Sequence, residues 1–157
     1  MSSMILGRSK VGKAVFAGRD FVKGEMIIEF TGPLLKKKDL PKRLKPEDDR
    51  YVQISKDEFM GASDDFDDYI NHSCDPNSGL KEIKGKLILF TIKDIKKGEE
   101  ITWDYSTTMA EDDWVMACKC GGPNCRKKIG DFKDLPKDLQ QKYIQLGIVP
   151  QFALDEA

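Results

Sequence analysis

Residues 71–77 read Asn-His-Ser-Cys-Asp-Pro-Asn, and this short run decides how the rest of the chain is interpreted. It contains the only histidine of the protein, His72, and one of its four cysteines, Cys74. The Asp-Pro-Asn ending favours a turn, because proline fixes φ and the flanking Asx side chains bond to nearby backbone. A bend that gathers Asn, His, Ser and Cys is typical of a functional site, and a well-capped loop is the simpler alternative.

The other three cysteines lie close together near the C-terminus, in Cys118-Lys-Cys120-Gly-Gly-Pro-Asn-Cys125. This C-x-C-x4-C spacing points several sulfurs at one centre. Thiolates bind zinc at about 2.3 Å, and a closed structural site takes four ligands. With Cys74 as the fourth ligand, the sequence predicts a zinc site that ties the cluster to the histidine-containing run. Disulfides or free thiols are the alternatives, and His72 could replace one cysteine.

A third segment, residues 98–105, reads Gly-Glu-Glu-Ile-Thr-Trp-Asp-Tyr. Apolar and polar residues alternate in it, so it predicts a strand that ends at Tyr105. A tyrosine at a strand end is ordinarily a packing residue. Here it precedes the cysteine cluster closely, which makes a shared site plausible.

In their order and spacing, these three segments resemble the SET-domain protein-lysine methyltransferases that carry a post-SET zinc motif. Residues 12–17, Gly-Lys-Ala-Val-Phe-Ala, are similar to the Gly-x-Gly cofactor loop of that family. The resemblance covers residues 8–130. It implies a mostly β, β-clip-like SET-domain fold of several small curved sheets with a knot-like core, plus a C-terminal helix.

The resemblance also implies an activity, the transfer of a methyl group from S-adenosylmethionine to a lysine side chain of a basic protein, such as a histone. The cofactors are then S-adenosylmethionine and Zn²⁺. The positions that match the family's functional residues are Tyr105 as the catalytic residue; Gly12, Lys13, Ala14, Asn71 and His72 as cofactor contacts; Tyr51 and Trp103 as the substrate channel; and Cys74, Cys118, Cys120 and Cys125 as zinc ligands.

Three positions depart from the family pattern. Ala14 replaces the second glycine of Gly-x-Gly, where an added methyl group could crowd the cofactor. Trp103 stands where relatives usually carry Phe or Tyr, and its bulk favours mono- or dimethylation. Asp68 stands where many relatives carry Arg, which removes any salt bridge that the arginine makes.

Two other functions compete with the enzyme. A catalytically silent SET-like module would bind lysine-rich segments without methylating them, and Ala14 and Asp68 are the only hints toward it. A zinc-bound structural protein would lack the cofactor altogether. Cofactor binding separates the enzyme from the structural protein, and methyl transfer separates it from the silent module.

Composition indicates a single soluble domain of 157 residues with net charge −1. We divide it into a SET domain (1–115), a post-SET motif (116–130) and a helical tail (131–157). The low net charge predicts no direct contact with nucleic acid, and no apolar run is long enough for a membrane span. The N-terminus lacks the apolar segment of a signal peptide. A cytoplasmic or nuclear location is expected, with export as an effector left open.

Short β-rich segments predict strands at residues 13–17, 25–30, 51–54 and 86–92. Residues 19–27 and 93–101 echo each other, each with a Lys-Gly turn, which suggests similar hairpins at two sheet corners. Residues 36–50 predict a loop or short helix. Residues 136–146 predict a helix that begins at proline and ends at glycine.

Acidic runs at residues 64–68 and 111–113 flank the expected site. An acidic rim would attract a lysine-rich peptide. A solvated acidic loop is the alternative.

Overall fold

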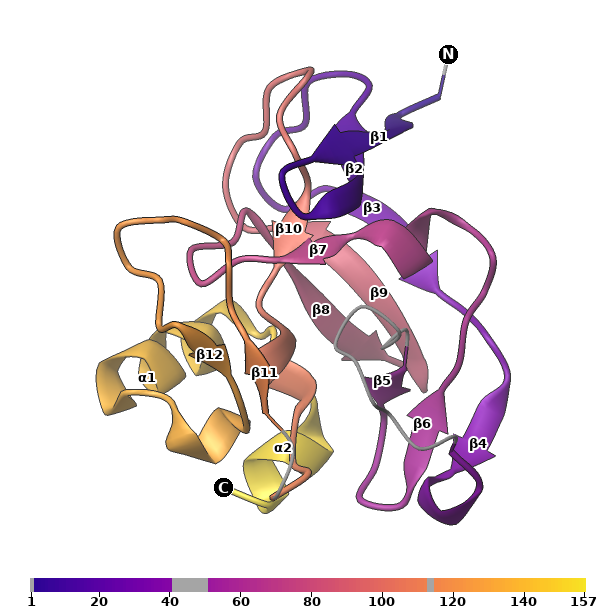
Figure 1. Ribbon diagram of the computed structural model, residues 1–157, viewed down its shortest axis with the longest axis vertical. Coiled ribbons are helices and arrows are strands. Elements are labelled where there is room, and N and C mark those ends of the chain that lie inside the picture. The colour runs from indigo at the N-terminus through magenta and orange to yellow at the C-terminus, as the bar shows by residue number, and fades with distance from the viewer. Residues whose placement is uncertain (1, 41–50, 113–114) are drawn as a thin grey trace.

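The computed structural model of the protein describes residues 2–40, 51–112 and 115–157, which form several small β-sheets and a helical C-terminal tail (Figure 1). The strands are β1 (Met4–Ser9), β2 (Gly12–Ala17), β3 (Met26–Phe30), β4 (Leu34–Lys36), β5 (Val52–Gln53), β6 (Glu58–Met60), β7 (Asn71–His72), β8 (Ser78–Ile83), β9 (Lys86–Thr91), β10 (Thr102–Trp103), β11 (Met116–Ala117) and β12 (Lys128–Ile129). The helices are α1 (Lys137–Leu146) and α2 (Gln151–Asp155), with short 3-10 turns at Lys37–Asp39, Phe66–Tyr69, Tyr105–Thr108 and Phe132–Asp134. The mostly β fold with several small sheets is therefore confirmed.

Three strands form one sheet in the order β3-β9-β8, and three form another in the order β4-β6-β5. The remaining strands pair in twos, as β1 with β2, β7 with β10, and β11 with β12. All of these pairs are antiparallel except β7 and β10, which run parallel. The sequence located β2, β3, β5 and β9. The expected helix or loop at residues 36–50 begins as the 3-10 turn at Lys37–Asp39, and its residues 41–50 lie outside the described ranges.

The two echoing segments are paired with each other and do not form two separate hairpins. The backbone of Phe21 exchanges two hydrogen bonds with that of Ile95, at 2.7 and 2.9 Å. Asp20 accepts a hydrogen bond from the backbone of the second segment's turn, and Asp94 accepts one from the first, both at 2.8 Å. The glycines of the two turns have φ values of 90° and 91°, a conformation that favours glycine. The two similar segments therefore form a pair of similar turns that are hydrogen-bonded to each other.

Among the described residues, the buried side chains form three clusters. The largest lies between the sheets and includes Ile101 and Trp103. A second surrounds Cys74 and Cys118, and a third lies beneath the tail. Tyr105 packs against both the first and the second cluster, so it lies at their junction. The position of this tyrosine is thereby fixed by apolar packing on two sides.

The tail contains the predicted helix, which is confirmed at Lys137–Leu146 with Pro136 before it and Gly147 after it. Gly147 has φ 71°, the left-handed conformation of a helix C-cap. Ile148 then packs on Gly79 of β8, where an added Cβ would lie 2.5 Å from Ile148 Cγ2. Because Gly79 has no side chain, Ile148 of the tail can pack directly against β8. In the described part of the chain, even the longest helix is far too short to cross a membrane.

Candidate active site

The parallel pairing of β7 with β10 brings two of the three motif segments side by side. Asn71 lies opposite Thr102, and His72 lies opposite Trp103. The side chain of Asn77 continues this pairing, because it donates to the carbonyl of Glu100 at 2.8 Å and accepts from the Thr102 amide at 3.0 Å. The segment 98–105 was predicted to be a longer strand, and only two of its residues are strand. The two hydrogen bonds of the Asn77 side chain take the place of the backbone pairing that a longer strand would make here.

Tyr105 begins a 3-10 turn that is separated from β10 by its N-cap residue Asp104, and its hydroxyl donates a hydrogen bond to the carbonyl of Ile70 at 2.8 Å. Its ring packs at 5.3 Å from His72 and at 4.8 Å from Trp103, measured between ring centroids. Its backbone N–H donates to His72 Nδ1 at 3.1 Å. Tyr105 is therefore held by Ile70 at its hydroxyl group and by His72 at its backbone amide.

His72 serves as a neutral hydrogen-bonding residue. Its Nδ1 accepts from Tyr105, which leaves the ring proton on Nε2, where it faces Cys74 Sγ at 3.3 Å. Burial lowers the pKa of His72 to about 4, although the nearby Asp104 acts in the opposite direction. The 3.5 Å approach of Nδ1 to Asp104 is consequently not an ion pair near neutral pH. The histidine joins the tyrosine to the cysteine cluster.

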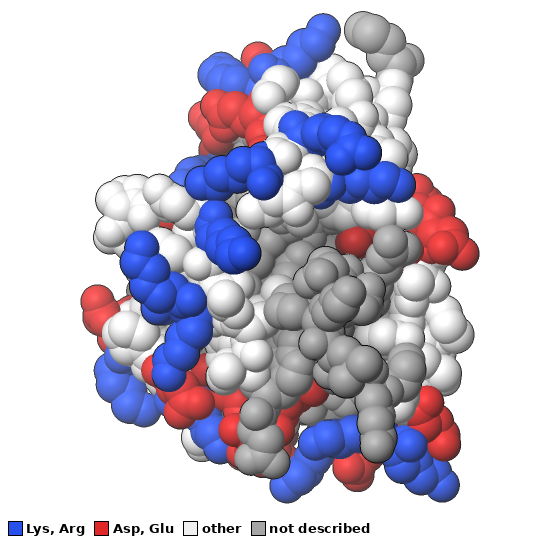
Figure 2. Space-filling view, viewed as in Figure 1, with Lys and Arg blue, Asp and Glu red and all other residues white. Residues whose placement is uncertain are grey.

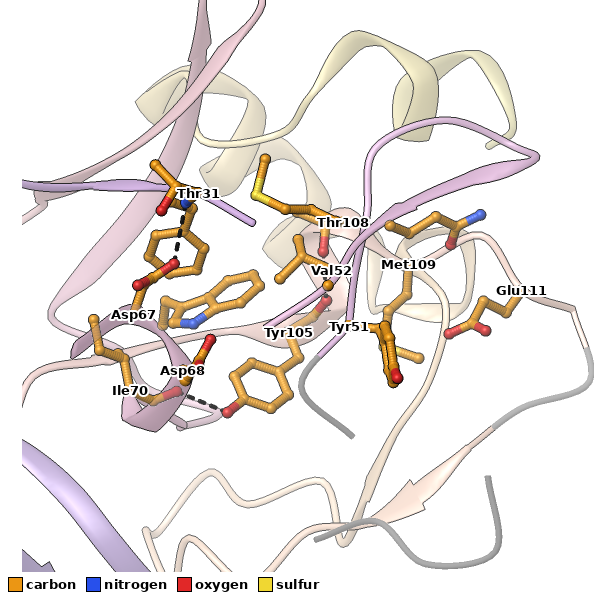
Figure 3. A pocket seen from close by; sticks show the side chains of 15 residues that line it. Thr31, Tyr51, Val52, Asp67, Asp68, Ile70, Tyr105, Thr108, Met109 and Glu111 are labelled. Atoms are coloured by element: carbon orange, nitrogen blue, oxygen red, sulfur yellow. Dashed lines mark hydrogen bonds between the residues drawn. The ribbon is translucent and has the colours of Figure 1, made fainter. Parts of the chain in front are cut away.

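One pocket is lined by Tyr51, Trp103 and Tyr105. The family resemblance placed the first two in the substrate channel and Tyr105 at the catalytic position. Figure 3 shows Asp67, Asp68 and Ile70 on one side of this pocket, with Tyr51, Met109 and Glu111 on the other side and Tyr105 between them. Among the residues that the structure describes, the lining consists of Phe30, Thr31, Tyr51, Val52, Gln53, Met60, Gly61, Asp67, Asp68, Ile70, Trp103, Tyr105, Thr108, Met109 and Glu111. Aromatic and apolar side chains thus form the walls, and three carboxylates face the same space.

The carboxylates belong to the two acidic runs noted in the sequence, of which Asp113 lies outside the described residues. Asp67 accepts from the Thr31 backbone at 3.1 Å and from the Ser63 hydroxyl. Burial nevertheless raises its pKa above the ordinary value. Asp68 accepts from the backbone of Ser63 at 2.9 Å and of Asp64 at 2.7 Å, so it caps the loop before the pocket. A pocket of this kind favours an elongated side chain with a cationic end.

The segment expected to contact the cofactor lies on the other side of β7. Asn71 Nδ2 donates to the Lys13 carbonyl at 2.9 Å and to Glu100 Oε1 at 3.1 Å. Gly12 has φ 115°, and an added Cβ there would meet nothing within 4 Å. Glycine is therefore favoured at this position by the backbone conformation and not by a lack of space. Ala14 is fully buried and pairs with Gly7 in a regular β1–β2 register. Its methyl group therefore does not displace the loop, and Gly12 and Lys13 provide the accessible surface of the segment.

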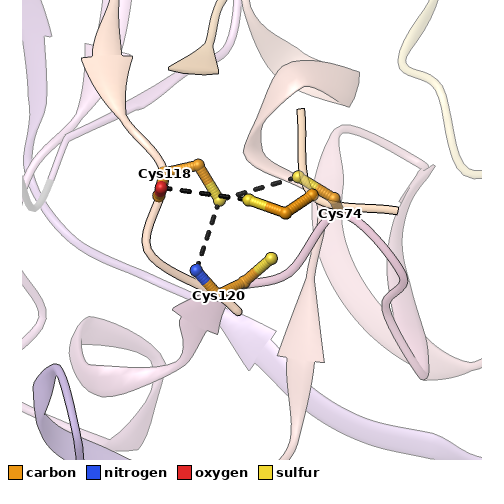
Figure 4. A group of neighbouring side chains, drawn as sticks. Cys74, Cys118 and Cys120 are labelled. Carbon is orange, nitrogen blue, oxygen red and sulfur yellow. Dashed lines mark hydrogen bonds between the residues drawn. The ribbon is translucent and has the colours of Figure 1, made fainter. Parts of the chain in front are cut away.

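The four cysteines converge, and their sulfur atoms all lie within 4.8 Å of one another (Figure 4). They are free thiols, and the Cys74 and Cys118 sulfurs are 3.6 Å apart. A tetrahedral site with zinc–sulfur distances of about 2.3 Å requires sulfurs about 3.8 Å apart. The arrangement therefore fits a four-thiolate metal ion, and a disulfide length does not fit it.

Backbone amides support this cluster. The Arg126 N–H donates to Cys74 Sγ at 3.4 Å, and the Cys120 N–H donates to Cys118 Sγ at 3.5 Å. Burial raises the pKa of the Cys74 and Cys118 thiols, whereas the Lys127 backbone N–H lowers the pKa of Cys125 to about 6. A divalent cation bound between the sulfurs would stabilise all four thiolates, which burial alone disfavours.

A buried carboxylate that the sequence analysis did not single out organises the site. Asp104 has a fully buried side chain and accepts from Arg126 Nη2 at 2.8 Å, Tyr143 Oη at 2.9 Å and the Ser106 amide at 3.0 Å. It thereby links the tyrosine turn, the cysteine loop and the tail. The one signal available was its place in the alternating segment, where an acid next to Trp103 had to find partners if it was buried.

The comparisons with known proteins agree with this geometry. The family model described as SET domain matches residues 12–106. The variant-silencing SET domain-containing protein of Plasmodium falciparum is 36% identical over 132 residues, which are 74% of this chain and 5% of the relative. The histone-lysine N-methyltransferase ASHH3 of Arabidopsis thaliana is 32% identical over 145 residues, which are 85% of this chain and 39% of the relative. The chain thus spans less than half the length of these relatives.

Among solved structures, KRYPTONITE in complex with mCHH DNA, H3(1-15) peptide and SAH superposes with a TM-score of 0.64 at 25% sequence identity. The superposition covers 80% of this chain and 29% of that one. The family match extends from the Gly12 segment through Tyr105, and it includes the paired strands β7 and β10. With Tyr105 and most of its pocket in the matched region, the chain belongs to the SET-domain family.

Proposed function

We propose that this protein is a protein-lysine N-methyltransferase that uses S-adenosylmethionine. The observation that carries the proposal is the convergence on Tyr105 of an aromatic pocket on one side and the Asn71–His72 segment on the other. The pocket suits a lysine side chain, and the opposite side contains the segments that match cofactor contacts. S-adenosylmethionine, when bound, supplies an electrophilic methyl group.

The pocket must deliver the lysine as a neutral amine. Free lysine has a pKa of about 10.4, so its neutral form costs about 4–5 kcal/mol near neutral pH. The carboxylates of Asp67, Asp68 and Glu111 attract the protonated side chain, and the rings of Tyr51 and Trp103 then surround it where water is scarce. Desolvation by these rings disfavours the ammonium form and lowers the pKa of the bound lysine, whereas the carboxylates act in the opposite direction and serve to capture the charged side chain.

Tyr105 aligns that amine. Its hydroxyl donates to the Ile70 carbonyl, which orients the phenol oxygen so that it would accept a hydrogen bond from the amine N–H. The phenol is buttressed by Trp103 and His72, which limits its motion. Placing the amine in line with the methyl group can contribute up to about 7–11 kcal/mol to the barrier reduction.

The four cysteines hold a structural zinc ion in this proposal, with no open coordination position and no catalytic role. The ion ties the loop of residues 118–125 to Cys74, two residues after His72. We divide the chain accordingly into a SET domain of residues 1–115, a post-SET motif of residues 116–130 and a tail of residues 131–157. Asp104 connects all three parts, through Arg126 and Tyr143.

The substrate class we propose is a lysine-rich basic protein, since the acidic pocket rim complements such a segment. The histone names of the relatives and the H3 peptide in the KRYPTONITE complex support a histone-like protein as one example. A cytoplasmic or nuclear location stays a prediction. The number of methyl groups is proposed to be one or two, because Trp103 is wedged between Phe30 and Tyr105 and narrows the pocket.

The test is transfer of labelled methyl from S-adenosylmethionine into a histone mixture and into a whole-cell lysate, by zinc-loaded protein. Tyr105→Phe removes only the hydroxyl and should reduce the rate by about 100-fold or more. Tyr69→Phe is the matched control, because Tyr69 lies outside the pocket lining, and it should keep its activity.

Calorimetry with S-adenosylhomocysteine accompanies the assay, so that loss of transfer is distinguished from loss of cofactor binding. Binding without transfer by the wild type, across both mixtures, would favour the silent module. An absence of cofactor binding would reject the enzyme. The fully buried Ala14 in regular β1–β2 pairing argues against the crowding that would cause such a failure.

A further inference from the structure

The charges of this protein are distributed very unevenly along the chain. Residues 1–19 and 115–130 contain eight Lys or Arg residues and no Asp or Glu. Since the whole chain has net charge −1, the remaining residues carry −9. The low net charge therefore conceals two strongly basic segments, which are far apart in the sequence.

The fold brings these segments together on one side of the molecule. The ammonium group of Lys10, in the β1–β2 turn, lies over Gly121 of the cysteine loop, where an added Cβ would collide with it. Lys119, Lys127 and Lys128 are exposed on that loop and on β12. Figure 2 shows Lys and Arg side chains gathered over β1, β2 and the loop between β11 and β12. We call Arg8, Lys10, Lys13, Lys119, Lys127 and Lys128 the basic face.

The basic face lacks the compensation that surface lysines usually have. Arg8 and Lys13 lie directly opposite each other across the hairpin, an arrangement that destabilises a strand pair. Within residues 2–40, 51–112 and 115–157, no carboxylate lies within 4.0 Å of any charged group of the face. By contrast, Arg19 and Arg126, the other cations of the two segments, are both paired with acids. A cluster of positive charges without nearby carboxylates favours the binding of an anionic partner.

Neither reactant of the proposed reaction is that partner. S-adenosylmethionine carries a net positive charge, and so does a lysine-rich substrate. The acidic pocket that suits the lysine is built from other residues, Asp67, Asp68 and Glu111. Net charge therefore gives neither reactant an attraction to the face as a whole, and Lys13 is the one member of the face that is also a proposed cofactor contact.

The composition of the face favours the phosphate backbone of a nucleic-acid duplex. Five of its six members are lysines, a residue type that is depleted at protein–protein interfaces. Single-strand binding uses aromatic stacking platforms. The two basic segments contain one aromatic residue, Phe16, and its ring packs against Gly7 of the neighbouring strand. Cations without stacking rings suit sequence-independent phosphate contacts.

We propose that the basic face binds duplex DNA through its phosphates, without reading its sequence. This inference goes beyond the methyltransferase activity and does not depend on it. It revises the expectation of no direct nucleic-acid contact, which rested on a net charge averaged over all faces. A duplex held here would leave the acidic pocket free for a lysine-rich protein.

The test is fluorescence anisotropy of a labelled 24-base-pair duplex with the zinc-loaded 157-residue protein at several salt concentrations. The variant Arg8→Glu/Lys10→Glu/Lys128→Glu reverses three charges of the face and avoids Lys13, a proposed cofactor contact. The matched control is Lys23→Glu/Lys97→Glu/Lys142→Glu, which makes the same change in net charge at exposed positions elsewhere. Zinc content and thermal melting verify that both variants are folded.

Each neutralised phosphate contributes about 0.9 to the slope of log affinity against log salt concentration. The face variant should therefore lose about 2 to 3 in slope and about 100-fold in affinity at 100 mM salt. The control should stay within twofold of the wild type, and a single strand of equal length should bind more weakly. Equal losses in both variants, or no duplex binding by the wild type, would overturn the proposal. Preferential binding of polyglutamate would overturn it also, in favour of an acidic protein partner.

Discussion

Replacing Asp104 with alanine should destabilise the protein more than any surface substitution, because its carboxylate is the buried anchor of three segments. The side chain has no exposed area and accepts from Arg126, Tyr143 and the Ser106 amide at 2.8–3.0 Å. Its loss leaves the Arg126 side chain, which is only 17% exposed, without its carboxylate partner. Breaking a buried pair by removing one partner costs about 3–5 kcal/mol.

For a chain of this size each kcal/mol changes Tm by about 2–4 °C, so Asp104→Ala should lower Tm by about 6–20 °C. The assay is thermal unfolding of zinc-loaded protein followed by circular dichroism. Glu82→Ala, at an exposed strand position, is the control and should change Tm by about 1–2 °C at most.

The double variant Asp104→Ala/Arg126→Met distinguishes a buried ion pair from a general packing defect. It removes the unpaired guanidinium and fills its space with an apolar chain, so it should recover part of the lost stability. A Tm decrease below 2 °C in the single variant would refute the reasoning. A double variant that is no more stable than the single one would refute the ion-pair account of the loss.

Four further results are expected. Chelation of zinc should lower Tm by at least about 10 °C, whereas an unchanged melting curve would reject the four-thiolate site. Gly79→Ala should lower the free energy of unfolding in urea by about 1–3 kcal/mol, since its Cβ would meet Ile148, and it should cost less when it is introduced into Ile148→Ala; an equal cost of Gly79→Ala in the two backgrounds would contradict the contact. Trp103→Phe should raise the average number of methyl groups per lysine in product mass spectra, and an unchanged number would show that the indole does not limit the pocket. A hydrogen bond from Arg19 lowers the pKa of Glu25 below 4.5. The stability that the ionised carboxylate contributes is therefore present above pH 4.5 and is lost as the pH falls through the lower pKa of the folded state. The Tm difference between wild type and Glu25→Gln should shrink over this pH range, and a difference that does not change with pH would exclude the linkage.

The sequence predicted the parts of the fold whose signals are local. The strands at β2, β3, β5 and β9 have β-branched or aromatic residues between turns, and α1 has a proline before it and a glycine after it. Strand β8 was missed because Ser78–Ile83 includes glycine, lysine and glutamate, and its strand state depends on pairing with β9. Two-residue strands such as β7 have no periodicity to detect.

The site was predictable where a motif was present and unpredictable where it depends on distant partners. The four cysteines meet as their spacing indicated, and Tyr51, Trp103 and Tyr105 share a pocket. The partners of Asp104 lie 22 and 39 residues away, and no local pattern announces such a contact. The pairing of the two echoing turns was likewise a matter of tertiary structure, because each alone looks like an ordinary hairpin.

The most direct test of the central claim is chemical identification of the product atom. Zinc-loaded protein is incubated with labelled S-adenosylmethionine and a lysine-rich protein, and the modified protein is hydrolysed to amino acids. The account predicts that the label is recovered as Nε-methyl-lysine with the wild type and is absent with Tyr105→Phe. Recovery of the label on another amino acid, or equal recovery from both proteins, would contradict it.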